Sequence, residues 1–168
     1  MTESSSRVDI AIIGAGPVGM TLALALAGGP YSVLLIDNRR RGAWETDPRA
    51  LALSHGSRQI LEHLGAWNAG AGTPIRSIHV SQRTGFGRTV IDADDYDLPA
   101  LGYVMRYRDL AATLAARIDP AHLLNEHALI SLTTGGEAAE ISLAGDGAEH
   151  GVAAQLVVHA EGTPGDEA

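Results

Sequence analysis

The chain has 168 residues, a length that supports one domain with its own hydrophobic core. Hydrophobic residues make up 45% and charged residues 19%, as in ordinary globular proteins and not in disordered or fibrous ones. The net charge of -8, from 12 basic and 20 acidic residues, argues against a nucleic-acid partner. Because there is no cysteine, disulfides, thiolate metal sites and thiol catalysis are excluded.

The start of the chain shows no targeting segment. Met1 to Arg7 is polar, and the apolar run Val8 to Ile13 that follows is too short for a signal peptide or a membrane span. The lack of cysteine fits a reducing compartment. We therefore expect a cytoplasmic protein forming one domain over residues 1–168, with residues 1–7 and 163–168 flexible.

The first recognisable pattern is a β-α-β unit. An apolar run, Val8 to Ile13, is followed by a glycine-rich turn, a helix-compatible stretch Pro17 to Ala27 and a second apolar run, Val33 to Ile36. Both runs are almost continuously apolar, which is typical of parallel strands covered on both faces. We expect these two strands to lie inside a sheet.

The middle of the chain predicts a helix and a hairpin. A polar stretch after Asp37 leads into a helix pattern from His55 to Leu64. Alternating residues in Ile75 to Arg83, a turn at Gly85 to Gly87 and the run Arg88 to Ile91 then indicate an antiparallel hairpin.

The last part predicts one more helix and a β-meander. Leu110, Leu114 and Ile118 share one face of a helix expected from Arg106 to Ile118, and Pro120 blocks its continuation. Glycine-containing turns then separate three short strand patterns, Leu129 to Thr133, Ala138 to Leu143 and Val152 to Val158.

A dinucleotide-binding motif joins the first strand to the first helix. Gly14-Ala15-Gly16-Pro17-Val18-Gly19 matches G-x-G-x-x-G directly after a buried strand and directly before a helix, the context that gives this motif its meaning. The first glycine allows a tight turn, the second a close approach of the pyrophosphate, and the third close helix packing. The positive end of the helix dipole then faces the bound anion.

An acidic residue follows at the expected distance. Asp37 ends the second strand about 20 residues beyond the motif, where a carboxylate accepts hydrogen bonds from ribose hydroxyls. The same carboxylate would repel a 2′-phosphate, so the site favours FAD or NAD over NADP. In a simple NAD domain, a third buried parallel strand should follow within about 30 residues. No such strand is evident there, which favours an FAD domain with antiparallel insertions.

Other polar groups have simpler interpretations. The run Arg39 to Arg41 could bind a phosphate, but we favour a solvated loop, and the residues alone leave Arg49 open between cofactor contact and solvent. An acidic cluster lacks the glycine and the bidentate glutamate of a calcium loop, because Tyr103 stands at the glutamate's position. The cluster comprises Asp92, Asp94, Asp95 and Asp97.

The histidines show no metal-ligand spacing. His122 and His127 are five residues apart and His55 and His63 eight, so we predict no metal site. Ser54 and His55 do not form a catalytic pair, because nothing supplies a nucleophile elbow or an oxyanion hole.

Three segments resemble the FAD-dependent aromatic hydroxylases of the para-hydroxybenzoate hydroxylase class, and among them the ubiquinone-biosynthesis hydroxylases. The first is the glycine motif with Asp37. The second runs from Asp47-Pro48-Arg49-Ala50-Leu51-Ala52-Leu53-Ser54 to Leu64-Gly65-Ala66-Trp67. The third combines Ile78-His79-Val80-Ser81 with Gly85-Phe86-Gly87 and Leu101-Gly102-Tyr103-Val104.

The resemblance implies an α/β fold, a Rossmann-like FAD-binding domain with a parallel sheet, helices and an antiparallel β-meander. It also implies a monooxygenase that reduces FAD with NADPH or NADH and uses O2 to hydroxylate an aromatic, ubiquinone-precursor-like substrate. The glycines would contact the pyrophosphate, Asp37 the adenosine ribose and Arg49 the flavin diphosphate region, with Arg106 a further candidate beside the flavin. No catalytic residue can be assigned. The expected cofactor-binding residues are Gly14, Gly16, Pro17, Val18, Gly19, Asp37, Asn38, Arg49 and Arg106.

The sequence also departs from the family pattern. Where members have Asp-Gly followed by serine and arginine, this chain has Glu161-Gly162-Thr163-Pro164. The second FAD motif and the substrate-facing sheet would lie beyond residue 168, so we expect the C-terminal half of the family fold to be absent and this chain alone to be inactive. An uncovered sheet face would favour self-association, and a lipid-tailed substrate a loose membrane association.

Two alternatives stay open at this point. One is a truncated, non-catalytic dinucleotide-binding module. The other is the coenzyme domain of an NAD-dependent dehydrogenase.

Overall fold

The computed structural model describes residues 6–68, 70–81 and 87–162. Its contacts divide the chain into two compact units. The first unit combines Met1–Ala43 with Leu114–Ala168, and the second, Trp44–Thr113, is inserted between these two segments. The first boundary of the second unit falls within the polar stretch after Asp37, whereas no linker-like stretch marks the second boundary, between Thr113 and Leu114.

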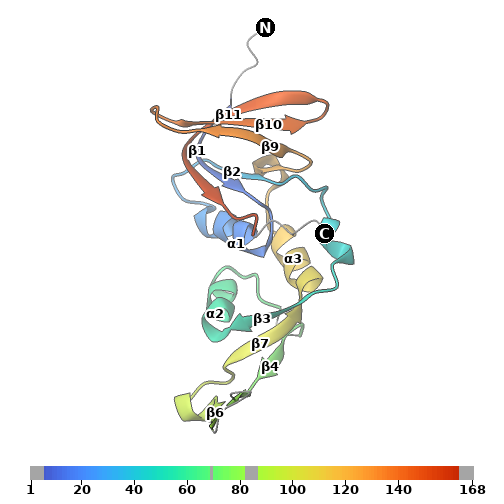
Figure 1. Ribbon diagram of the computed structural model, residues 1–168, viewed down its shortest axis with the longest axis vertical. Helices are drawn as coiled ribbons and strands as arrows, with labels where there is room; N and C mark the ends of the chain where they lie inside the picture. The colour runs from blue at the N-terminus through green and yellow to red at the C-terminus, as the bar shows by residue number, and fades with distance from the viewer. Residues whose placement is uncertain (1–5, 69, 82–86, 163–168) are drawn as a thin grey trace. The chain divides into compact units, whose positions relative to one another are not determined.

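The first unit contains a six-stranded mixed sheet in the order β8-β2-β1-β11-β10-β9 (Figure 1). β1 pairs in parallel with both β2 and β11, while β9, β10 and β11 form an antiparallel meander. The predicted β-α-β unit and meander are therefore confirmed. The strands are β1 Ser6–Ile13, β2 Val33–Ile36, β8 Leu123–Leu124, β9 Ala128–Thr133, β10 Ala139–Gly145 and β11 Ala148–His159.

The continuous apolar character of β1 follows from its central position. Ala11 and Ile13 belong to a core cluster with residues of β2, β10 and β11, whereas Ile12, which points to the opposite face, is also fully buried. Helix α1, Pro17–Leu26, packs against β1 and β2 through its buried residues Gly19, Met20 and Ala23. Both faces of β1 are thus covered, as its sequence predicts.

A third parallel strand is present, but it comes late in the chain. β8 pairs in parallel with β2, joining Leu35 to Leu123 and Ile36 to Leu124. The sequence analysis looked for this strand soon after β2 and did not find it, because the whole second unit intervenes. The pattern is also too short to recognise, since β8 comprises Leu123 and Leu124 alone.

The second unit is built from antiparallel strands. One sheet has the order β3-β7-β4, and β5 pairs with β6 in the predicted hairpin. The turn expected at Gly85 to Gly87 lies largely outside the described residues. The strands are β3 Ala50–Ser54, β4 Thr73–Ile75, β5 Ser77–Ser81, β6 Arg88–Asp92 and β7 Gly102–Arg106.

A capping group marks the start of α2, and strand pairing marks the start of α3. α2 begins at His55 as predicted, and the Ser54 hydroxyl caps it by accepting a hydrogen bond from the Ser57 amide, 3.1 Å away. Arg106 was expected to open the next helix, but it pairs with Ala50 across the β3-β7 ladder. The helix therefore begins one residue later, at Tyr107. The bounds are α2 His55–His63 and α3 Tyr107–Ala115, with short 3-10 helices η1 Ala43–Thr46, η2 Asp94–Tyr96 and η3 Pro120–His122.

The sequence analysis missed β3, β4 and β7. β3 carries the sequence Ala50-Leu51-Ala52-Leu53-Ser54, whose alanines and leucines are good helix formers, so its strand conformation depends on pairing with β7. At the N-terminus, Ser6 and Arg7 already belong to β1, where they pair with Val152 and Ala153.

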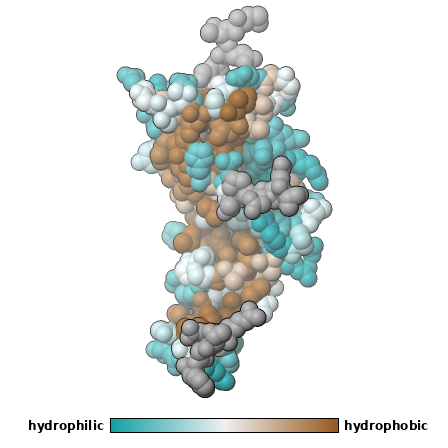
Figure 2. Space-filling model, in the orientation of Figure 1, coloured by the Kyte–Doolittle hydropathy of each residue, from teal (hydrophilic) through white to brown (hydrophobic). Residues whose placement is uncertain are grey.

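Apolar side chains are exposed on the β5–β6 hairpin. Figure 2 shows apolar surface toward the bottom of the view, where Figure 1 places β6. Ile78, Val80 and Val90 are each more than 40% exposed. None of the helices in the described part of the chain has the length and apolar character needed to span a bilayer. Self-association through an exposed apolar surface remains a prediction.

The glycine-rich loop is held in place by the end of β11. Gly14 has a φ of +108°, and a Cβ added there would lie 2.7 Å from the backbone of Ala160 and Glu161. The Ala160 amide also donates a hydrogen bond of 2.7 Å to the Ile13 carbonyl. At Gly19, a Cβ would lie 1.9 Å from the Gly14 carbonyl oxygen. Both positions therefore require glycine because backbone atoms occupy the space of a side chain.

A matched pair of substitutions can separate the effect of this close approach on stability from the effect of a positive φ. Gly14→Ala and Gly135→Ala both place alanine at a positive φ, +108° and +118°, but Gly135 has no atom within 4 Å of its added Cβ. We expect Gly135→Ala to lower the free energy of unfolding by about 1–2 kcal/mol. Gly14→Ala should cost about 1–3 kcal/mol more, because it also overpacks the loop.

Urea denaturation of both variants measures the difference. Equal losses of stability would show that the end of β11 does not constrain the loop.

Candidate functional site

The N-terminus of α1 presents uncapped donors next to the glycine loop. Gly16 is the N-cap, in an extended conformation, and no side chain caps the helix. The first backbone bond of the helix joins the Met20 amide to the Gly16 carbonyl at 2.9 Å. Pro17, the first helical residue, has no N–H, and Val18 is 73% exposed. The earliest helical amides are therefore available to an anion.

Asp37 lies at the carboxyl end of β2 and is buried. Its main chain is fixed from both sides, since its amide donates to the Leu124 carbonyl at 2.8 Å and its carbonyl accepts from the His127 amide at 3.0 Å. Its carboxylate oxygen Oδ2 accepts a 2.7 Å hydrogen bond from the Ala15 amide, inside the glycine motif. The structure therefore brings Asp37 to the loop, as the sequence analysis expected from its spacing.

Arg39 completes the bonding of this carboxylate. Its side chain donates from Nε to Oδ1 and from Nη2 to Oδ2 of Asp37, each at 2.9 Å, and its amide donates to Oδ1 at 2.8 Å. With the Ala15 bond, about four acceptor positions of an ionised carboxylate are used. Arg39 to Arg41 lie in an exposed loop, as expected, and Arg39 also pairs with Asp37 while its side chain stays 46% exposed. The sequence held one signal for this contact. An aspartate side chain often accepts a hydrogen bond from the backbone amide two residues later, and Arg39 is two residues after Asp37.

These contacts control the ionisation of Asp37. Burial raises the pKa of the carboxyl, but hydrogen bonds from the Arg39 side chain and from the Arg39 and Ala15 amides outweigh burial and lower the pKa below its usual value. Asp37 is therefore a carboxylate at neutral pH. Asn38, next in the chain, is exposed.

The two other expected cofactor-binding residues lie in the second unit. Arg49 makes a bidentate ion pair with Asp47, with Nε–Oδ1 at 2.9 Å and Nη2–Oδ2 at 2.6 Å, and its guanidinium lies 4.4 Å from the Tyr107 ring centroid. Arg106 is exposed at the end of β7 and lines a shallow polar pocket with Asp47, Pro48 and Arg108. The contacts of Arg49 and Arg106 with the cofactor remain predictions.

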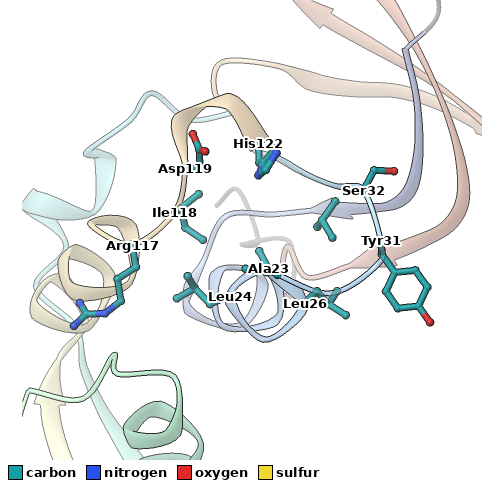
Figure 3. A pocket seen from close by; sticks show the side chains of 12 residues that line it. Ala23, Leu24, Leu26, Tyr31, Ser32, Arg117, Ile118, Asp119 and His122 are labelled. Carbon is teal, nitrogen blue, oxygen red and sulfur yellow. The ribbon is translucent and has the colours of Figure 1, made fainter.

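An apolar cavity of the first unit lies at the wrong end of α1 for a nucleotide (Figure 3). It is lined by the last turn of α1, by Tyr31 and Ser32 before β2 and by Ile118 and His122. Ligands of open α/β sheets bind at the carboxyl ends of the strands, where Asp37 and the glycine loop lie. The cavity is therefore not the dinucleotide site.

The residues of the first unit fit one end of FAD. A glycine loop without room for side chains, an uncapped helix N-terminus and a buried carboxylate suit a pyrophosphate and the adenosine ribose. The fit has one condition. Because the acceptor positions of Asp37 are already used, a ribose hydroxyl can bond to Asp37 only if the Arg39 side chain moves.

The lowered pKa of Asp37 predicts how stability depends on pH. The pKa in the folded state lies below the value of about 3.9 expected in the unfolded chain, so the ionised carboxyl stabilises the fold above that pH. This stabilisation is lost as the pH falls through the folded-state pKa. We expect Asp37→Asn to lower the urea midpoint at pH 6, and the difference from the unmodified chain to shrink below about pH 4.

Urea midpoints measured from pH 3 to pH 7 provide the test. A difference that stays constant across this range would show that the charge of Asp37 contributes nothing to stability.

Comparisons with known proteins agree with this geometry. The family model described as the FAD binding domain matches residues 7–166. The 3-demethoxyubiquinol 3-hydroxylase of Escherichia coli is 30% identical over 170 residues, covering 95% of this chain. Ubiquinone hydroxylase UbiM of Neisseria meningitidis is 40% identical over 67 residues, 38% of this chain. The flavin-dependent monooxygenase PieE, solved with FAD and substrate, shares the fold at 22% identity, with a TM-score of 0.72, over 90% of this chain.

These relatives are longer than the region they share. The chain spans 42% of the E. coli hydroxylase, 14% of UbiM and 29% of PieE. The predicted fold class and cofactor are confirmed, since the match to the family covers almost every described residue. This chain belongs to the FAD binding domain family.

Proposed function

We propose that this chain is the FAD-binding portion of a flavin-dependent monooxygenase that hydroxylates an aromatic ring of the ubiquinone-precursor type. The observation that carries the proposal is the buried Asp37 carboxylate bonded to the glycine loop beside an uncapped helix N-terminus. This arrangement suits the adenosine and pyrophosphate end of FAD. The family match excludes the NAD-dependent dehydrogenase considered from the sequence.

The substrate class rests on the relatives. The E. coli relative that aligns with 95% of this chain hydroxylates 3-demethoxyubiquinol, as its name states. The name of the N. meningitidis relative, ubiquinone hydroxylase, points in the same direction. A quinol precursor is an electron-rich ring, which suits hydroxylation by a flavin and O2. NADPH or NADH is the proposed reductant.

When bound, FAD supplies the redox chemistry, and the described residues supply binding and orientation. The amides at the start of α1 face the pyrophosphate and favour its negative charge. Asp37 accepts from the ribose once Arg39 has released it. Nothing in the described residues identifies a group that contacts the reacting ring.

A dinucleotide-binding module without turnover is the alternative function. It would use the same loop and the same Asp37, so nucleotide binding alone cannot distinguish it from the monooxygenase. A cytoplasmic location, and a loose membrane association through a lipid-tailed substrate, are parts of the proposal that rest on the resemblance and composition.

Nucleotide binding can be tested with two carboxylates of the same sheet. Asp37 lies at the carboxyl end of β2, whereas Asp9 lies near the start of β1, where it binds the Ser32 amide at 2.7 Å. We expect Asp37→Asn to weaken ADP binding about tenfold to a hundredfold, equivalent to about 1.5–3 kcal/mol for a charge-assisted bond. Asp9→Asn should bind ADP like the unmodified chain.

Titration calorimetry with ADP measures both affinities. Equal weakening by the two substitutions, or none by either, would remove Asp37 from the binding site.

Turnover needs a cellular test. We expect the open reading frame that contains this chain to restore the product in E. coli cells that lack their 3-demethoxyubiquinol 3-hydroxylase. The same frame with Asp37→Asn should restore less, because FAD binding is weakened. Extracted quinones are quantified by chromatography and mass spectrometry. A frame that binds FAD but restores no product, here or with a panel of related phenols and NAD(P)H in vitro, would favour the non-catalytic module.

A further inference from the structure

Two histidines and an aspartate gather at the β10–β11 turn, in the first unit. His127 directly precedes β9, Asp146 is in the turn between β10 and β11, and His150 is on β11. Each offers one ligand atom, and these atoms all lie within 4.8 Å of one another. The sequence analysis predicted no metal site from histidine spacing. It could not detect this group, because strand pairing brings together residues that have no helical or turn spacing.

The backbone fixes the position and tautomer of His127. The His127 side chain is buried against Gly145, where a Cβ would lie 2.3 Å from the ring. Its Nδ1 lies 2.6 Å from the Asn125 carbonyl oxygen. Since a carbonyl can only accept, Nδ1 carries the proton and Nε2 keeps its lone pair. Metal-binding histidines commonly donate their second ring N–H to a backbone carbonyl in this way.

Asp146 and His150 both lie close to the His127 ring. Asp146 Oδ2 lies 3.9 Å from His127 Nε2, and the rings of His127 and His150 are 5.1 Å apart between centroids. His150 Nε2 lies 3.1 Å from the Gly145 carbonyl oxygen, so it donates and leaves the lone pair on Nδ1. Two imidazole rings and one carboxylate thus lie in one place.

The three ligand atoms would have to move closer together to bind a zinc ion. Zinc bonds of about 2.0–2.2 Å in a tetrahedron place ligand atoms about 3.4 Å apart, against separations of up to 4.8 Å here. The Asp146 side chain is 81% exposed on a turn and 3.9 Å from His127 Nε2, so it has room to approach, whereas His127 is held by its packing. Imidazole nitrogens favour zinc and its neighbours over Mg²⁺ or Ca²⁺, which prefer oxygen ligands.

We propose that His127, Asp146 and His150 bind one Zn²⁺ ion, with water as the fourth ligand. The ion would join the residue that precedes β9 to the β10–β11 hairpin and would stabilise the meander. A Zn²⁺ ion bound to the folded chain also raises the unfolding temperature, provided that the unfolded chain binds it less. The site is independent of FAD, so its test does not depend on the proposed function.

The test uses the untagged 168-residue chain and ZnCl2 as the probe. The variants are Asp146→Asn and His150→Ala, with His122→Ala as the control because His122 is an exposed histidine of the same unit outside the cluster. Calorimetry should show one Zn²⁺ per chain, at least tenfold weaker for both cluster variants and unchanged for the control. Co²⁺ should give the intense visible absorption of a four-coordinate site in the unmodified chain and in His122→Ala, but not in the two cluster variants.

Circular dichroism checks that each variant is folded, and both substituted positions are exposed or half-buried. A saturating amount of Zn²⁺ should raise the Tm of the unmodified chain and of His122→Ala by several degrees, and leave the Tm of His150→Ala unchanged. The proposal is overturned if no saturable binding of one ion per chain occurs. It is also overturned if the cluster variants bind Zn²⁺ as tightly as the control, which would leave His127, Asp146 and His150 neighbours that share no ion.

Discussion

The hydrogen bond of 2.7 Å from the Ala15 amide to the Asp37 carboxylate ties the end of β2 to the glycine loop. A buried carboxylate is costly unless it is paired, and Arg39 and two backbone amides provide the pairing here. Together with the end of β11 at Gly14, this contact positions the glycine loop beside the carboxyl end of β2. The Asp37 carboxylate is occupied by the protein's own donors, so in the proposed complex nucleotide binding exchanges one set of hydrogen bonds for another. The affinity of that complex would then depend on how readily the Arg39 side chain leaves Asp37.

The order of strands explains how one short motif becomes a site. β1 lies between two parallel neighbours, and the carboxyl ends of β2 and β11 converge on the loop from opposite sides. The end of β11 leaves no space for a side chain at Gly14. The second unit is inserted after β2 and carries the arginine segment that resembles the hydroxylases. The strand order thus places the glycine loop, the Asp37 carboxylate and the start of the inserted unit near one another along the chain.

Much of this could be predicted from the sequence, for physical reasons. Continuous apolar runs, a glycine motif in context and an acid at the right distance determined β1, α1, β2 and the role expected of Asp37. Weaker local signals failed. β8 is too short to recognise, β3 reads as helix-forming and is a strand because β7 pairs with it, and Arg106 is drawn into β7 by the same ladder. The Asp37–Arg39 pair and the His127 cluster depend on side-chain geometry that no periodicity encodes.

In the proposed complex, the dinucleotide binds at the glycine loop and displaces Arg39 from Asp37. NMR amide chemical shifts recorded during an ADP titration can detect this displacement. The largest changes should fall on Ala15, Gly16, Val18 and Gly19 and on Asp37 to Arg39, with the Arg39 Nε–H resonance shifting as its bond to Asp37 breaks. Changes concentrated around Tyr31 and His122 at the opposite end of α1, or an unchanged Arg39 resonance at saturation, would contradict it.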